Sequence, residues 1–102
     1  MESKLDYINR LQATVQHLHG CGAIHRGTVP VHEVFQGHTV WQGDVEVFDL
    51  TGHSGAKRAY GWSHREGVHD GDERFVTVLE IPPVVSPQTA VRASVMADFK
   101  KK

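Results

Sequence analysis

Four runs of β-forming residues lie between two segments of helical periodicity, and this pattern restricts the chain to an α+β fold. The runs cover about Thr28–Phe35, Thr39–Leu50, Lys57–His64 and Arg74–Ile81, and turn-forming glycines separate them. Pro82-Pro83 ends the last run, because proline offers no backbone N–H to a neighbouring strand. We predict one curved four-stranded antiparallel sheet, with a helix before it and a helix after it.

Apolar residues at helical spacing predict the two helices. The first segment starts with Ser3 as a helix cap and stops at Gly20, so we expect a helix over about Ser3–His19. The last segment opens with Ser86-Pro87, which is a typical helix start. The apolar positions that share one side are Ile8, Leu11, Val15 and Leu18 in the first helix, and Val91, Val95 and Phe99 in the second.

The chain has 102 residues, the size of a single domain, 1–102. Its formal net charge of −1 argues against nucleic acid as a partner, because nucleic-acid-binding domains are usually strongly basic. No apolar run approaches the roughly 20 residues that a membrane helix needs. The only cysteine, Cys21, gives no sign of an oxidising compartment, so we expect a cytoplasmic protein without membrane contact.

Both faces of the predicted sheet carry apolar side chains. In the second run Trp41, Val45 and Val47 have one parity, whereas Val40, Phe48 and Leu50 have the other. We expect both helices to pack on one face of the sheet, the face of Trp41, Val45 and Val47. The other face then needs a cover of its own, which can be a partner subunit, a ligand or strong curvature of the sheet into a half-barrel. A symmetric homodimer is the commonest solution.

The open face of this predicted sheet carries the candidate binding residues. If the third run presents Arg58, Tyr60, Trp62 and His64 on the same side as Glu46, Phe48 and Phe75, an aromatic floor with a few polar groups results. The predicted ligand-binding residues are Phe48, Arg58, Tyr60, Trp62 and Phe75. The alternative is a dimer-facing sheet in which Glu46 and Arg58 form a cross-strand pair.

The same face offers candidates for catalysis. A carboxylate beside a histidine can support general acid–base chemistry, because the carboxylate holds the imidazole in one tautomer. The catalytic candidates are His64, Glu46 and Asp44. No motif in the sequence calls for a cofactor.

Eight histidines in this short chain are unusual, and imidazole both binds metals and titrates near neutrality. The densest group comprises His17, His19, Cys21 and His25, and it lacks the paired spacing of a structural zinc site. We therefore predict no metal site. A histidine-based metal or pH sensor remains one alternative function.

The leading hypothesis is a binding or interaction module that acts as a homo-oligomer, and whose open aromatic face meets a partner chain or a small ligand. The alternative from another class is a small metal-independent enzyme that uses Glu46 and His64 on that face.

Overall fold

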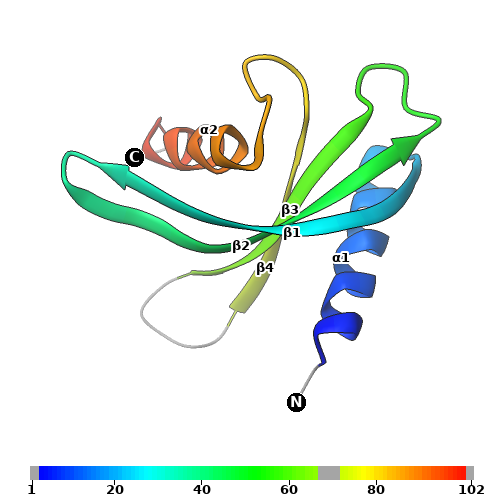
Figure 1. Cartoon of the computed structure of the whole chain (residues 1–102), viewed down its shortest axis with the longest axis horizontal. Coiled ribbons are helices and arrows are strands. Elements are labelled where there is room, and N and C mark those ends of the chain that lie inside the picture. Colours follow the sequence, from blue (N-terminus) through cyan, green and yellow to red (C-terminus); the bar gives the residue numbers. More distant parts are fainter. Residues whose placement is uncertain (1–2, 67–71, 101–102) are drawn as a thin grey trace.

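The computed structural model describes residues 3–66 and 72–100, with side chains described for residues 3–63 and 74–97. The elements in chain order are α1 (Lys4–His19), β1 (Gly22–Phe35), β2 (His38–Thr51), β3 (Arg58–Glu66), β4 (Asp72–Leu79) and α2 (Pro87–Lys100). The strands form one unclosed antiparallel sheet in the order β1-β2-β3-β4 (Figure 1). This confirms the predicted helix, four-stranded sheet and second helix.

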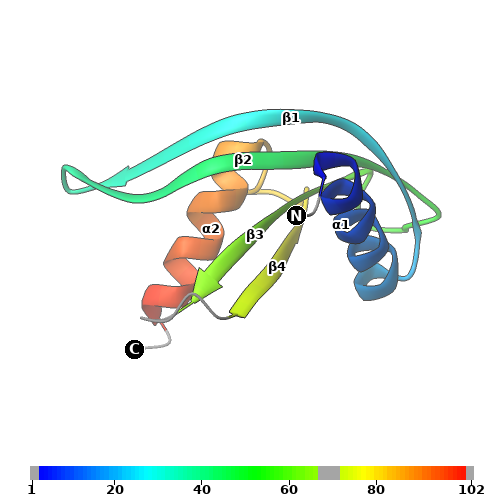
Figure 2. The ribbon, with the colours of Figure 1, turned by 90° about the horizontal axis from the view of Figure 1, so that it is seen from below.

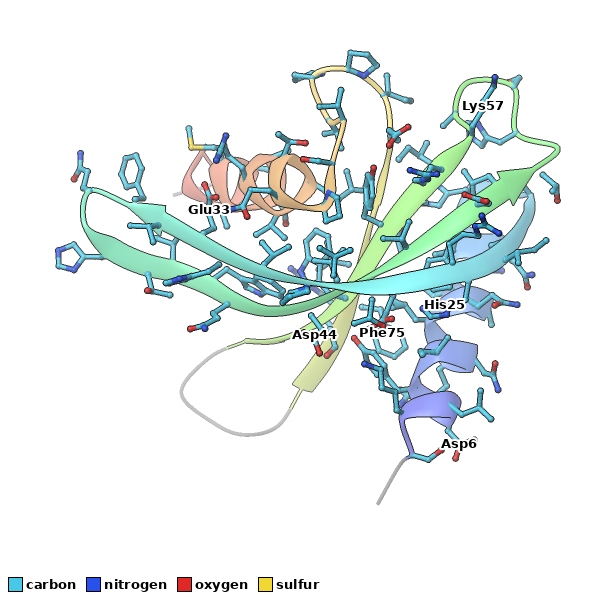
Figure 3. All side chains as sticks on the ribbon, viewed as in Figure 1. Asp6, His25, Glu33, Asp44, Lys57 and Phe75 are labelled. Atoms are coloured by element: carbon cyan, nitrogen blue, oxygen red, sulfur yellow. The ribbon has the colours of Figure 1, made fainter. Side chains whose placement is uncertain are left out.

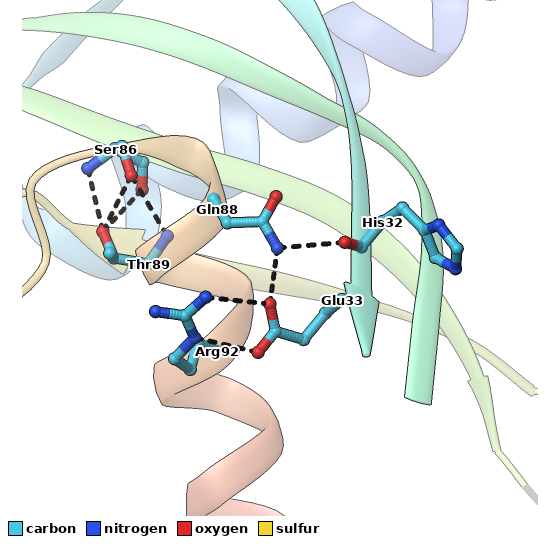
Figure 4. Close-up of polar contacts among 6 residues, drawn as sticks. All are labelled: His32, Glu33, Ser86, Gln88, Thr89 and Arg92. Atoms are coloured by element: carbon cyan, nitrogen blue, oxygen red, sulfur yellow. Dashed lines mark hydrogen bonds and ion pairs between the residues drawn. The ribbon is translucent and has the colours of Figure 1, made fainter. Parts of the chain in front are cut away.

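Local signals determine where the helices begin and end. The Ser3 hydroxyl oxygen accepts a hydrogen bond from the Asp6 amide at 3.1 Å and caps α1. Gly20 ends α1 in the left-handed region, with φ 62°, where glycine avoids the strain of a Cβ atom. At the start of α2, the Thr89 amide donates to the Ser86 hydroxyl at 3.2 Å (Figure 4).

β1 begins at Gly22, earlier than the start at Thr28 that the sequence predicts. The segment from Gly22 to Gly27 pairs with the end of β2, but it contains few β-branched residues and gives a poor strand signal. The hairpin turn at Gln36 and Gly37 has φ 51° and 80°, as expected for a tight two-residue connection. A bulge between His25 and Gly27 interrupts the register of β1 with β2.

The sheet consists of two hairpins that share a short junction. β2 pairs with β3 only from Glu46↔Gly61 to Asp49↔Arg58. Beyond this junction the β1–β2 hairpin continues alone as a two-stranded ribbon, residues 29–45, which we call the arm. Figure 2 shows β1 and β2 arching over β3 and β4.

The two helices lie on opposite faces of the sheet, so the prediction that both cover one face is wrong. The α2 face carries Val45 and Val47, which form one core with Tyr60, Trp62 and the α2 residue Val91. The α1 face carries side chains of the other parity, and its core joins Leu11 and Val15 of α1 to Ala23, Phe48 and Ala59. Figures 1 and 2 show α2 beside the arm and α1 on the other side, at the opposite end of β1 and β2.

Each face of the sheet therefore has one helical cover, and each helix covers only part of its face. This removes the reason for expecting a homodimer, which was a whole apolar face without cover. A hollow remains on each face. The first lies on the α2 face, where the middle of β1 passes the start of α2, and the second lies on the α1 face along the arm.

Candidate functional site

The register separates the residues that the sequence placed in one site. On the α1 face, Glu46 lies opposite Gly61. Phe48 lies opposite Ala59 on the same face, so both predicted site residues face small residues of β3. Tyr60 lies opposite Val47 and belongs to the α2 face, as do Arg58 and Trp62 by alternation along β3. The predicted surface combining all these residues does not exist.

The predicted aromatic floor is also interior rather than open. Phe48, Tyr60 and Trp62 are 0%, 1% and 2% exposed, and they belong to two different cores. Phe75 is half-buried on the α1 face, where its ring meets that of Tyr7 edge-on with 5.9 Å between centroids. Two of the predicted binding residues, Arg58 and Tyr60, line a hollow on the surface.

Glu46 does pair with a histidine, but that histidine is His25. His25 Nε2 lies 2.8 Å from Glu46 Oε1, and the Thr28 hydroxyl donates to the same oxygen at 2.5 Å. The side chain of His64 lies outside the described residues, so the predicted pair of Glu46 with His64 stays a prediction. Figure 3 shows His25, Asp44 and Phe75 on the α1 side of the sheet, whereas Glu33 lies on the α2 side.

The prediction from the sequence did not place His25 beside Glu46, because it started the first strand at Thr28 and left out the segment that contains His25. Once that strand is extended to Gly22, His25 falls opposite Phe48. The rings of His25 and Phe48 then meet edge-on at 5.5 Å, which fixes the imidazole beside the sheet. The predicted Glu46–Arg58 pair is also absent, because Arg58 lies opposite Asp49.

A hollow of about 420 Å³ opens on the α2 face beside the start of α2. Its apolar walls come from Val29, Val47 and Val85, and Val85 is 61% exposed. Its polar walls come from the two arginines Arg26 and Arg58 and from Tyr60, with Gly27, Ser86 and Pro87 completing the lining.

A shared carboxylate orders the two arginines. Arg26 Nε lies 2.9 Å from Asp49 Oδ2, and Arg58 Nε lies 3.3 Å from Asp49 Oδ1. A guanidinium has five N–H donors, so two contacts to one carboxylate use only a small part of the ten that this pair offers. The hydrogen bond that Arg58 donates to Asp49 raises the pKa of Arg58 and keeps that side chain charged.

Tyr60 forms the inner polar wall of this hollow. Its hydroxyl donates to Glu80 Oε2, which satisfies the buried phenol. Burial, followed by the hydrogen bond and negative charge of Glu80, raises the pKa of Tyr60 to about 12. The phenol is therefore neutral at physiological pH, and the ionic character of the hollow comes from its arginines and their carboxylate partners.

The described residues contain no group of three or more His, Cys, Asp or Glu side chains that could hold a metal ion. Within the same part of the chain, neither helix is long and apolar enough to cross a membrane. Comparison with known proteins found no matching family model, no matching curated protein and no matching solved structure.

Proposed function

We propose that this chain is a binding module whose hollow beside α2 takes a small molecule with a carboxylate or phosphate group on an apolar body. The observation that carries the proposal is that two arginines and three valines line the same hollow of about 420 Å³. Small-molecule sites usually measure ~300–1,000 Å³ and combine apolar walls with a few polar groups.

The arginines supply the specificity in this proposal. Planar guanidinium groups match the oxygens of carboxylates and phosphates, and charge-assisted hydrogen bonds are stronger than neutral ones. Arg26 and Arg58 are 62% and 45% exposed, so they can reach a ligand while they remain ordered by Asp49. The N-terminus of α2, where Ser86 and Pro87 line the hollow, adds partial positive charge.

The apolar part of the ligand would lie against Val29, Val47 and Val85. Glu80 limits the ligand class, because its charge lies close enough to Arg58 to raise the pKa of that arginine. Two arginines and two carboxylates, Asp49 and Glu80, then lie at or near the hollow. A ligand with a single anionic group is favoured over a polyanion, because the two carboxylates repel further negative charge.

The experiment is an amide NMR titration with 2-naphthoate and with its neutral analogue 2-naphthamide. We expect naphthoate to shift the amides that line the hollow and to bind about tenfold more tightly than the amide, as one charge-assisted contact implies. Arg26→Gln and Arg58→Gln should remove this preference. Arg74→Gln, on the opposite edge strand, is the matched control and should keep it.

Equal affinities for the two probes, or shifts centred elsewhere, would contradict the proposal. A native mass spectrum of the untagged protein provides an independent check. Retained small-molecule mass on the monomer supports the binding module. A dimer that dissociates in Val85→Lys would show instead that a second copy of the chain covers this opening.

A further inference from the structure

Glu46 on the α1 face has a buried carboxylate oxygen that lacks a hydrogen-bond partner. Its side chain is 1% exposed, and both described hydrogen bonds, from His25 and Thr28, go to Oε1. Among the described residues no group donates to Oε2. Burying a carboxylate oxygen without a hydrogen-bond donor costs free energy. A ligand that donates a hydrogen bond to Glu46 Oε2 would remove this cost.

The ammonium group of Lys4 lies beside this oxygen but does not donate a hydrogen bond to it. Lys4 Nζ lies 3.9 Å from Glu46 Oε2 and 3.8 Å from Asp44 Oδ2, between the two carboxylates. Charge-assisted N–H···O bonds are about 2.7–2.9 Å long, so Lys4 balances the charge without forming either bond. The side chains of Lys4 and Asp44 are 57% and 58% exposed, so this ion pair lies at the surface above the buried Glu46.

The surface next to this position has room for an aliphatic chain. A second hollow, of about 220 Å³, is lined by the arm residues Pro30, His32, Gln42 and Asp44, together with Val31 and Gly43. Asp44 thus belongs both to the ammonium position and to the hollow. An extended ligand held at Glu46 and Asp44 can continue along the part of the α1 face that α1 leaves uncovered.

We propose that Glu46 and Asp44 form a binding site for a primary ammonium group on an aliphatic chain, and that Lys4 occupies this position in the free chain. A primary ammonium carries three donors and fits between two carboxylates, whereas a quaternary ammonium carries none. His25 and Thr28 hold Oε1 in place, so Oε2 faces the incoming ammonium. The site is separate from the hollow beside α2 and does not depend on the function proposed for it.

The experiment removes the Lys4 side chain from the site and then adds a small diamine that can bind in its place. In Lys4→Ala, 1,4-diaminobutane should raise the thermal unfolding midpoint by several degrees, whereas tetramethylammonium chloride at the same ionic strength should not. The wild-type chain should respond less, because Lys4 competes for the position. Amide shifts on adding the diamine should centre on residues 25–28 and 44–46.

Two further variants identify the atoms that bind. Glu46→Gln in the Lys4→Ala background should abolish the effect of the diamine. If that double variant fails to fold, Asp44→Asn in the same background replaces it, because Asp44 is exposed, and it should weaken the effect about tenfold. An equal response to the diamine and to tetramethylammonium, or a diamine response that both variants retain, would overturn the proposal.

A third probe distinguishes the source of the ammonium group. Binding of the diamine that is tighter than that of Nα-acetyl-lysine-methylamide indicates a free amine as ligand. The reverse order indicates a lysine side chain of another protein. Both results support the ammonium site, whereas binding of neither probe refutes it.

Discussion

Glu33 in the arm accepts hydrogen bonds from Arg92 of α2, with 2.9 Å between Arg92 Nε and Glu33 Oε2 and 3.4 Å between Nη2 and Oε1 (Figure 4). Gln88 of α2 donates to the same carboxylate and, at 3.1 Å, to the backbone carbonyl of His32. Glu33 is 7% exposed, so its buried charge depends on these donors. The contacts fasten α2 to the arm.

Glu33→Gln should lower the thermal unfolding midpoint by a few degrees and flatten its dependence on acidic pH. The hydrogen bond from Arg92 lowers the pKa of Glu33 below its ordinary 4.5. A carboxyl whose pKa is lower in the folded state stabilises the fold above the unfolded-state pKa. This stability is lost as pH falls from 4.5 through the folded-state value. Circular dichroism melts between about pH 3 and pH 7 measure the effect, and an unchanged slope in Glu33→Gln would contradict it.

Gly61→Ala should destabilise the fold by about 1–3 kcal/mol, as overpacking a core commonly does. A Cβ atom at Gly61 would lie 3.1 Å from Leu11 Cδ1, and Leu11 is completely buried under α1. Gly27→Ala is the matched control, because a Cβ atom there meets nothing within 4 Å. Urea unfolding of the two variants measures the difference. Equal stabilities would show that α1 packs less closely on β3 than the structure indicates.

The pairing of β3 around Gly61 shows why the helices and strands could be predicted from the sequence, whereas the candidate site could not. Periodicity identifies α1, α2 and β2 because their side chains follow simple spacings. The pairing of β2 with β3 is a choice between registers, and a slip of one residue exchanges the two faces. The small residues Ala59 and Gly61 alternate with the large Tyr60 and Trp62, and this alternation was the available signal that a helix packs closely on the small side.

The contact between His25 and Glu46 was beyond this kind of prediction for another reason. It depends on the early start of β1 and on a bulge that shifts the register between His25 and Gly27. A bulge adds one residue to one strand, and no spacing rule in the sequence locates it. The hollow beside α2 likewise combines the loop before α2 with three strands, and only the folded chain brings these segments together.

Tyr60 should titrate about two pH units above an ordinary tyrosine and should destabilise the fold at high pH. Its pKa is raised from 10.0 to about 12, mainly by burial. Because the folded state favours the neutral phenol, this stability is present below pH 10 and is lost as pH rises through about 12. The chain has two tyrosines, so absorbance titration of Tyr60→Phe and of the control Tyr7→Phe assigns the late-titrating group. A late step that survives in Tyr60→Phe would contradict this assignment.

His19, the last residue of α1, should titrate below the ordinary value of 6.5 even though it lies at a helix C-terminus, where the dipole favours a charged imidazole. Burial is the main cause of its lowered pKa, and the charge of nearby His53 adds to it. The neutral ring is held by its contact with the Thr77 hydroxyl, with 2.8 Å between Nε2 and Oγ1. The stability that His19 contributes is therefore present above pH 6.5 and is lost as pH falls through the folded-state value.

In NMR titration of the histidine rings, His53→Gln should raise the pKa of His19 only part of the way to 6.5, because burial remains. The exposed His38→Gln is the control and should leave the titration of His19 unchanged. Full recovery of 6.5 in His53→Gln would mean that charge, rather than burial, controls this histidine.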